Sequence, residues 1–476
     1  MANEAVKFQL SWIGPIARDK TGRMARVLQT FKPIAMLVLA GLLLSASLVQ
    51  ASAQSTSISL IRDAEIEALL ADYAQPLMKA AGLRQGAVQI YIVNDPAFNA
   101  FVSGSGLFVH TGLLLQAKEP NEVIGVLAHE IGHVVGGHQT RLRERVAEAT
   151  RRAKWATLLG IGLAAGGAAV GSGDLSAAGF GVAGGARNAA LRDVLRYQRD
   201  EEQSADRTAV RLLVETGQSA RGMLSTFRRL AQQTSILAGR IDPYMLSHPT
   251  ANERIARLRA VVEESPHYAK RDSASLQLRH DMARAKIAAY VGGSRYAQSV
   301  LQGSELQEQA KQYGRAIVTF LYSSPKRALP LIDKLASAMP SNAYVHEMKG
   351  EILLRSGQAG AAVAPFRQAV ALDKRGAGFL RVELGHALLE SGNAREAAEE
   401  LQKGLRRDPS AVEGFRHLAR ARAEIGDEAG ALLATAEYAI GTGKREEARD
   451  YARRAQAGYK RGSPGWLRAQ DIVEVR

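Results

Sequence analysis

The chain has 476 residues, 46% of them hydrophobic, and this length exceeds what one compact core organises, so we expect two or three domains. It contains no cysteine, which excludes disulfides, thiolate metal sites, a cysteine nucleophile and a lipid-modified cysteine anchor. The formal net charge of +15 favours anionic partners such as lipid headgroups, lipopolysaccharide or nucleic acid, although a high charge also serves solubility alone.

Residues 1–53 have the order of a secretory signal. Basic residues precede an apolar run at 34–44, and the small residues at 51–53 suit cleavage near Ala53. The apolar run is shorter than the ~20 residues that span a membrane, which favours export over an uncleaved anchor. The residues before Met24 fit no targeting pattern, so we expect Met24 to be the true start.

A small β-sheet between helices is predicted for the next part of the chain. Apolar residues recur at helical spacing over 58–83, which predicts a first helix. Residues 87–95 alternate like a strand, and 99–112 read as two short strands around a Ser-Gly turn. After Pro120, Asn121 is a capping residue, so a second helix is expected to begin there and to run through His133.

A basic segment then leads into a Gly/Ala-rich tract at 155–190. The tract is interrupted at Ser172-Gly173-Asp174, and neither half reaches transmembrane length, so we expect a hairpin of two short helices. One interpretation packs it over the preceding helix, as close Gly/Ala contacts permit. The other dips it into a membrane surface, with Trp155 and the arginines at the interface. We favour the first, because close packing is the commoner use of such residues.

The C-terminal third repeats, after charged helices that end near Glu264 and a linker region at 265–305. Gly357, Gly392 and Gly426 end helices at spacings of 35 and 34 residues, and small residues recur at fixed offsets from them. Paired helices with this period are the signature of tetratricopeptide repeats, whose units must stack to bury their apolar faces. Residues 306–476 therefore predict four repeats and a final capping pair, with a generic helical bundle as the alternative.

The segment "VLAHEIGHVVGGH" (126–138) carries the chemistry. His129 and His133 lie four apart on a helix and so point the same way, with Glu130 at the edge of that face. Two imidazoles and an open position suit zinc, which lowers the pKa of a bound water to about 7. Glu130 would take a proton from that water and pass it to the leaving amine. The arrangement is that of a metallopeptidase.

A third ligand separates this hypothesis from two core histidines in a chance motif. In "RDEEQSAD" (199–206), Glu202 and Asp206 share a helix face one turn apart. One of them can bind metal while the other orients a ligating imidazole. Glu201 is expected to point to solvent. His138, five residues after His133, falls off the metal face and is interpreted as structural, as is His110 on its strand.

"HEIGH" followed by "EQSAD" resembles the Ste24-type zinc metallopeptidases, and "SHPTANERI" (247–255) with the repeats is similar to their periplasmic branch. The resemblance implies a mostly α fold with a small β-sheet: a zincin-like metallopeptidase domain at 54–264, then an α-solenoid of tetratricopeptide repeats. It also implies one Zn²⁺ per chain. The implied roles are metal ligation by His129, His133 and Glu202, general base catalysis by Glu130, and support by the acid Asp206.

Two further residues are open to alternative interpretations. His248 is either a movable group that binds the transition-state oxyanion or closes the open zinc position, or a helix-start histidine satisfied by local backbone. We take the catalytic role as the working hypothesis. Arg254 either supports an oxyanion or pairs with an acid of the site.

The strand near 99–102 could bind an extended peptide by main-chain hydrogen bonds, which favours unfolded or stalled envelope proteins as substrates. The resemblance implies a periplasmic endopeptidase whose repeats dock it to the outer-membrane protein assembly machinery. The alternative is a repeat-based chaperone or assembly scaffold with a largely latent protease domain. Membrane-surface contact stays open for 155–190. Nucleic acid is disfavoured as a partner, because no recognised module accompanies the basic charge.

Overall fold

The computed structural model describes residues 59–170, 172–236 and 251–474. The predicted export signal and His248 lie outside the described residues. The described part belongs to one compact unit that begins at Ser59.

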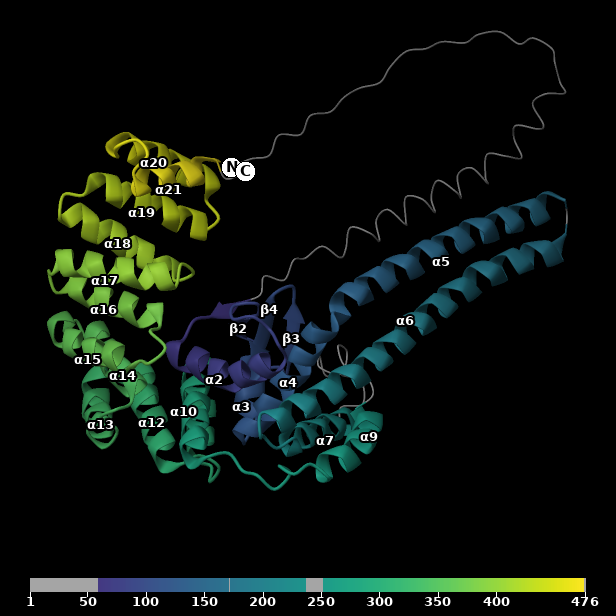
Figure 1. The fold of residues 1–476 in the computed structure, drawn as a ribbon, viewed down its shortest axis with the longest axis horizontal. Coiled ribbons are helices and arrows are strands. Elements are labelled where there is room, and N and C mark those ends of the chain that lie inside the picture. Colours follow the sequence, from purple (N-terminus) through teal and green to yellow (C-terminus); the bar gives the residue numbers. More distant parts are fainter. Residues whose placement is uncertain (1–58, 171, 237–250, 475–476) are drawn as a thin grey trace, which may run out of the picture. The chain divides into compact units, whose positions relative to one another are not determined.

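A four-stranded sheet lies near the start of this unit (Figure 1). The predicted strand pair at 99–112 is an antiparallel hairpin that turns at Gly104, where φ is +60°. The second strand of this hairpin also pairs in parallel with the strand predicted at 87–95, which leaves the first strand of the hairpin at one edge. In the order β1-β2-β4-β3, the strands are β1 (Leu60–Ile61), β2 (Gln89–Val93), β4 (Gly106–His110) and β3 (Ala100–Ser103).

Helix α2 (Ala64–Ala80) starts later than predicted, because Leu60 and Ile61 pair in the sheet and the Asp63 side chain caps the helix. Helix α4 (Pro120–Gly136) matches the predicted second helix, but Asn121 does not cap it. The Asn121 amide instead bonds Ser219 and Gly222, next to α7 (Arg221–Ile236). Every residue of α4 from Pro120 to Gly132 is buried, so the histidine helix runs through the core. The short α3 (Thr111–Gln116) precedes it and α9 (Ala251–Glu263) follows α7.

The expected hairpin of two short helices is instead formed by two long ones, α5 (His138–Ala169) and α6 (Gly173–Glu215). Charged segments extend the Gly/Ala tract on both sides without a break, so the tract and the "RDEEQSAD" acids share α6. The preferred expectation, packing over α4, is not met by the described side chains of the tract: Gly179 lies against Gly160 and Ala164 of the other arm, and Trp155 and Phe180 are exposed. Among the described residues, no helix has the length and apolarity that crossing a membrane requires.

The C-terminal residues form stacked helix pairs at the predicted period (Figure 1). Gly357, Gly392 and Gly426 end the first helix of three pairs with φ of +73°, +85° and +81°, a conformation that favours glycine. The four pairs are α12 (Glu308–Tyr322) with α13 (Pro325–Ala338), α14 (Ala343–Arg355) with α15 (Ala359–Leu372), α16 (Gly378–Glu390) with α17 (Ala394–Arg407), and α18 (Val412–Glu424) with α19 (Glu428–Gly441). The predicted capping pair is α20 (Arg445–Gly458) and α21 (Pro464–Glu474).

Buried polar contacts join α2 to the C-terminal helices. Helices α10 (Ala274–Val291) and α11 (Gly293–Gln302) occupy the predicted linker. Lys286 of α10 is buried, with its Nζ 2.7 Å from Asp63 and 3.4 Å from Glu65. The Tyr313 hydroxyl of α12 donates to Glu65 at 2.9 Å. The linker is therefore part of a continuous core rather than a tether.

Candidate metal centre

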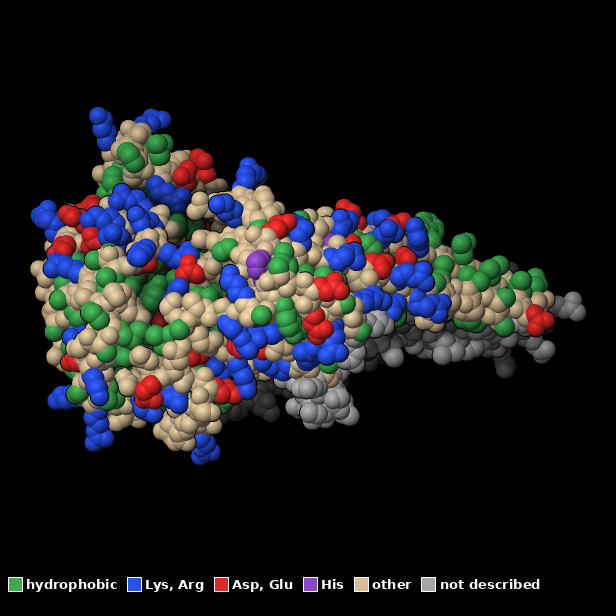
Figure 2. Space-filling view, turned by 60° about the horizontal axis from the view of Figure 1, so that its bottom comes forward, with side chains coloured by type: hydrophobic (Ala, Val, Ile, Leu, Met, Phe, Trp, Pro, Cys, Tyr) green, Lys and Arg blue, Asp and Glu red, His purple; other side chains and the backbone are tan. Residues whose placement is uncertain are grey.

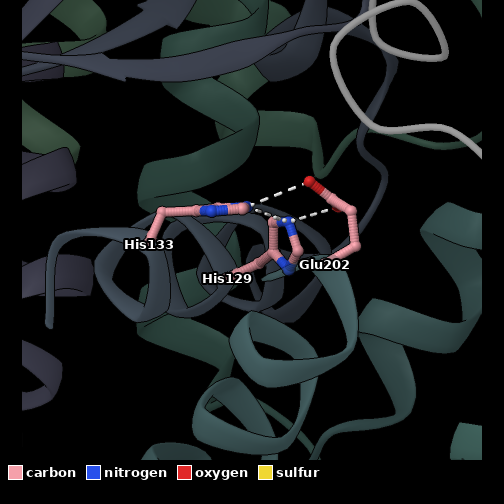
Figure 3. A group of neighbouring side chains, drawn as sticks. All are labelled: His129, His133 and Glu202. Carbon is pink, nitrogen blue, oxygen red and sulfur yellow. Dashed lines mark hydrogen bonds and ion pairs between the residues drawn. The ribbon is translucent and has the colours of Figure 1, made fainter. Parts of the chain in front are cut away.

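Helices α4 and α6 bring His129, His133 and Glu202 together (Figure 3). One nitrogen from each imidazole and a carboxylate oxygen all lie within 4.8 Å of one another. The two Nε2 atoms are 3.0 Å apart, and each is 3.3 Å from an oxygen of Glu202. His129 and Glu202 are buried, and His133 is nearly so. Two imidazoles and one carboxylate make a ligand set that suits a divalent metal such as zinc.

A close helix crossing makes this convergence possible. Gly132, between the two histidines on α4, lies against Ala205 on α6: a Cβ at Gly132 would come within 2.8 Å of the Ala205 carbonyl oxygen. Ala205 is one turn beyond Glu202. The absence of a side chain at Gly132 therefore sets how near the carboxylate comes to the imidazoles.

We expect Gly132→Ala to force α4 and α6 apart, destabilising the protein by about 1–3 kcal/mol and weakening zinc binding. Thermal unfolding and a zinc titration measure the two effects. The matched control is Gly162→Ala on α5, where an added Cβ meets nothing within 4 Å. This control is expected to leave zinc binding unchanged and to stabilise slightly, because alanine favours helix more than glycine does. Equal zinc affinity in both variants would contradict the role of the crossing.

Asp206 and Arg254 surround the ligands. Asp206 lies 2.9 Å from Nδ1 of His129, the ring nitrogen that the ligand cluster does not use, and so fixes the orientation of the ring. The Arg254 guanidinium bonds both oxygens of Asp206, at 2.7 and 2.8 Å, and lies 3.0 Å from Glu202. Of the two interpretations of Arg254, the structure shows the ion pair with site acids.

Charged neighbours shift the pKa values of Asp206 and His129. Burial opposes a charge on Asp206, but Arg254 and His129 lower the pKa of Asp206 overall. Burial and Arg254 also oppose protonation of His129, yet hydrogen bonds with Asp206 and Glu202 raise the pKa of this imidazole to about 9. The acids thus stabilise a proton on His129, and this proton must leave before the imidazole can bind a metal ion.

Glu130 borders the cluster. A cavity of about 140 Å³ is lined by Glu130, His133 and Glu202 together with Phe101 and Val102 of the edge strand β3. Burial raises the pKa of the Glu130 carboxyl, which makes it a better proton acceptor when it is ionised. The predicted base, two predicted ligands and the sheet edge therefore meet at one cavity.

Two residues that the sequence analysis placed away from the site lie beside it. Gly137 ends α4 with φ of +63°, and this turn brings His138 back so that its Nδ1 lies 2.8 Å from Nδ1 of His133. If α4 continued as a regular helix through residue 138, His138 would point away from the metal face, as the sequence analysis expected. Glu201, expected to point to solvent, lies 2.5 Å from Nε2 of His138 and also pairs with Arg141. The two consecutive glycines after the motif were the signal that the helix ends before His138.

Comparison with known proteins finds a matching family model, similar sequences and solved structures that align with part of the chain. Residues 60–262 match peptidase family M48. The chain is 26% identical over 419 residues to the beta-barrel assembly-enhancing protease of Escherichia coli strain K12, covering 86% of this chain and 82% of that protein. It is 32% identical over 174 residues to the metalloprotease YcaL of the same strain, covering 36% of this chain and 60% of YcaL. The crystal structure of YrrB, a TPR protein, aligns with 42% of this chain and 98% of its own at 19% identity and a TM-score of 0.30.

Proposed function

Because residues 60–262 form a peptidase family M48 domain and the chain is a metalloprotease, we propose that it is a zinc-dependent endopeptidase of the periplasm. Its substrates in this proposal are misfolded or stalled envelope proteins. The observation that carries the proposal is the convergence of His129, His133 and Glu202 from two helices beside the cavity that Glu130 lines.

In the proposed mechanism, His129, His133 and Glu202 hold the ion. Zinc, when bound there, supplies Lewis acidity that activates a water for attack on a peptide carbonyl. Glu130 accepts a proton from the attacking water and returns it to the departing nitrogen. Asp206 keeps the His129 ring in place through Nδ1, and Arg254 holds Asp206 in turn. His248, as a transition-state or latency group, stays a prediction.

The edge strand supports the choice of substrate. Within the part of the chain that the structure describes, strand β3 pairs with β4 alone, and its residues Phe101 and Val102 line the cavity beside Glu130. A peptide that adds to such an edge binds through its main chain and must be extended. Unfolded segments satisfy this requirement, whereas most folded proteins do not.

Docking to the outer-membrane protein assembly machinery through the repeats is the next part of the proposal. It is supported by the likeness to the beta-barrel assembly-enhancing protease, which extends over 419 residues and so includes the helix pairs as well as the peptidase domain. A chaperone or assembly scaffold with a latent protease is the second candidate. Burial favours it: His129 is 0% and Glu130 1% exposed, so substrate has little access in this conformation.

The proposal is tested by digesting an unfolded protein, casein, beside a tightly folded one. We expect casein alone to be cleaved, a chelator to remove more than about 99% of the cleavage, and stoichiometric zinc, but not magnesium, to restore it. Cleavage that survives complete metal removal would contradict a metal-dependent mechanism. Equal cleavage of the folded protein would contradict selection of extended chains.

A further inference from the structure

The α5–α6 hairpin has small residues between its arms and large apolar side chains on its surface, the reverse of the usual arrangement for helices in water. Its two arms touch through small residues: a Cβ at Gly179 of α6 would lie 2.4 Å from the Gly160 carbonyl oxygen and 2.5 Å from the Ala164 nitrogen. Its large apolar side chains face outward instead, with Trp155 69%, Leu159 65% and Phe180 67% exposed. Small residues between helices and large ones outside are typical of helices in an apolar surrounding.

Charge divides the hairpin into two zones. Asp174, in the first turn of α6, is the one charged residue between Lys154 and Arg187. Because Gly179 lies opposite Gly160 and Ala164, Lys154 on α5 and residue 187 on α6 fall at about the same level. Beyond that level, towards the catalytic helices, exposed basic side chains outnumber acidic ones: Arg151, Arg152, Lys154, Arg192 and Arg196 stand against Glu148, which pairs with Arg152, and Asp193. Figure 2 shows the hydrophobic side chains towards the far end of the hairpin and the Lys and Arg side chains nearer its base.

We propose that the apolar end of the hairpin inserts into the surface of an anionic lipid membrane. Its arms measure about 24 Å from Trp155 to Val170 at 1.5 Å per residue, less than the ~30 Å of a hydrocarbon core, so the hairpin enters the membrane without crossing it. Trp155 marks the boundary between the two zones, where tryptophan is favoured at membrane interfaces. The basic side chains below it then meet acidic headgroups.

A groove at the boundary fits the same occupant. It has a volume of about 730 Å³ and is lined by residues of both arms, among them Ala149, Leu158 and Leu191, and Lys154 is the charged residue among the described lining residues. An acyl chain with its acidic headgroup beside Lys154 matches this lining. A protein partner is less favoured, because beyond Lys154 the described lining offers only the hydroxyls of Thr150 and Thr157 to fix its register.

Vesicle sedimentation and the fluorescence of Trp155 test the proposal. The chain has tryptophans at 12, 155 and 466, and the first lies within the predicted export signal, so a Trp466→Phe background leaves Trp155 as the reporter in the processed chain. We expect zinc-loaded protein to sediment with phosphatidylethanolamine–phosphatidylglycerol vesicles and the Trp155 emission to shift to shorter wavelength on binding. Binding to uncharged phosphatidylcholine vesicles is expected to be weaker by at least about tenfold. Added salt is expected to weaken binding to the charged vesicles.

The decisive variant is Leu158→Ser/Leu159→Ser/Phe180→Ser, which is expected to bind charged vesicles at least about tenfold more weakly. The matched control replaces three exposed apolar residues of the repeats, Leu331, Ile425 and Leu467, by serine and is expected to bind like wild type. Casein cleavage should persist in both variants, because Phe180 lies about 33 Å along α6 from Glu202. Loss of membrane binding can therefore be distinguished from loss of the proposed peptidase activity.

Three results would overturn the proposal. The first is that wild-type protein binds neither kind of vesicle, or that the Trp155 emission wavelength does not change on binding. The second is a triple serine variant that binds like wild type. The third is self-association of the wild-type protein without lipid, or its binding to unfolded casein, that is lost in the triple serine variant. The apolar face would then bind a second copy of the chain or a protein partner.

Discussion

Replacement of Glu130 by glutamine is expected to slow casein cleavage by about 10²–10⁴-fold while the protein keeps one zinc per chain. Glutamine has the shape of glutamate but cannot accept the proton that the attacking water must lose. Glu130 lines the cavity beside His133 and Glu202, and its carboxyl lies in the core, where no bulk base can replace it. Cleavage rate and zinc content are measured on the same purified sample.

The same variant separates the two candidate functions. If proteolysis is the physiological role, a strain carrying Glu130→Gln has the envelope defect of a strain lacking the protein. A strain that behaves as wild type would support the scaffold instead. Deletion of residues 306–476 is a less clean comparison, because it removes Tyr313, which donates to the buried Glu65 of α2, and so disturbs the peptidase domain as well.

Replacement of Glu202 by alanine is expected to abolish both zinc binding and cleavage. Glu202 is the one contribution of α6 to the three-residue ligand cluster, and two histidines alone hold zinc far more weakly. Isothermal titration with zinc measures the affinity, which we expect to fall by more than about 100-fold, since loss of even an outer-sphere partner costs 10–100-fold.

Glu201→Ala is the matched control, one residue away on the same helix. Glu201 contacts His138, which contacts His133, so this variant is expected to keep zinc at one per chain with an affinity reduced by about tenfold. An affinity loss in Glu201→Ala as large as that in Glu202→Ala would contradict the assignment of Glu202 as the ligand from α6.

Local periodicity predicted much of this structure. The spacing of His129 and His133 fixes their shared face on any helix, and the positions of Glu202 and Asp206 one turn apart do the same on α6. The repeat glycines Gly357, Gly392 and Gly426 mark helix ends because their positive φ suits glycine. These features depend on residues close in sequence, so the sequence alone was sufficient to predict them.

The sequence analysis missed three features, namely the position of His138, the partner of Glu201 and the length of α5 and α6. The turn at Gly137 returns His138 to His133, whereas an uninterrupted helix would have carried it away. The pairing of Glu201 with His138 needed that turn to be known first. The length of α5 and α6 was missed because charged residues flank the Gly/Ala tract and resemble a boundary, although they continue the same helices.

The most direct measurement is a crystal structure of the zinc-loaded protein with anomalous data collected at the zinc absorption edge. We predict one strong peak at about 2.0–2.2 Å from Nε2 of His129, Nε2 of His133 and a carboxylate oxygen of Glu202. No peak after zinc addition, or a peak bound by other residues while Glu202 faces away from both histidines, would contradict the account.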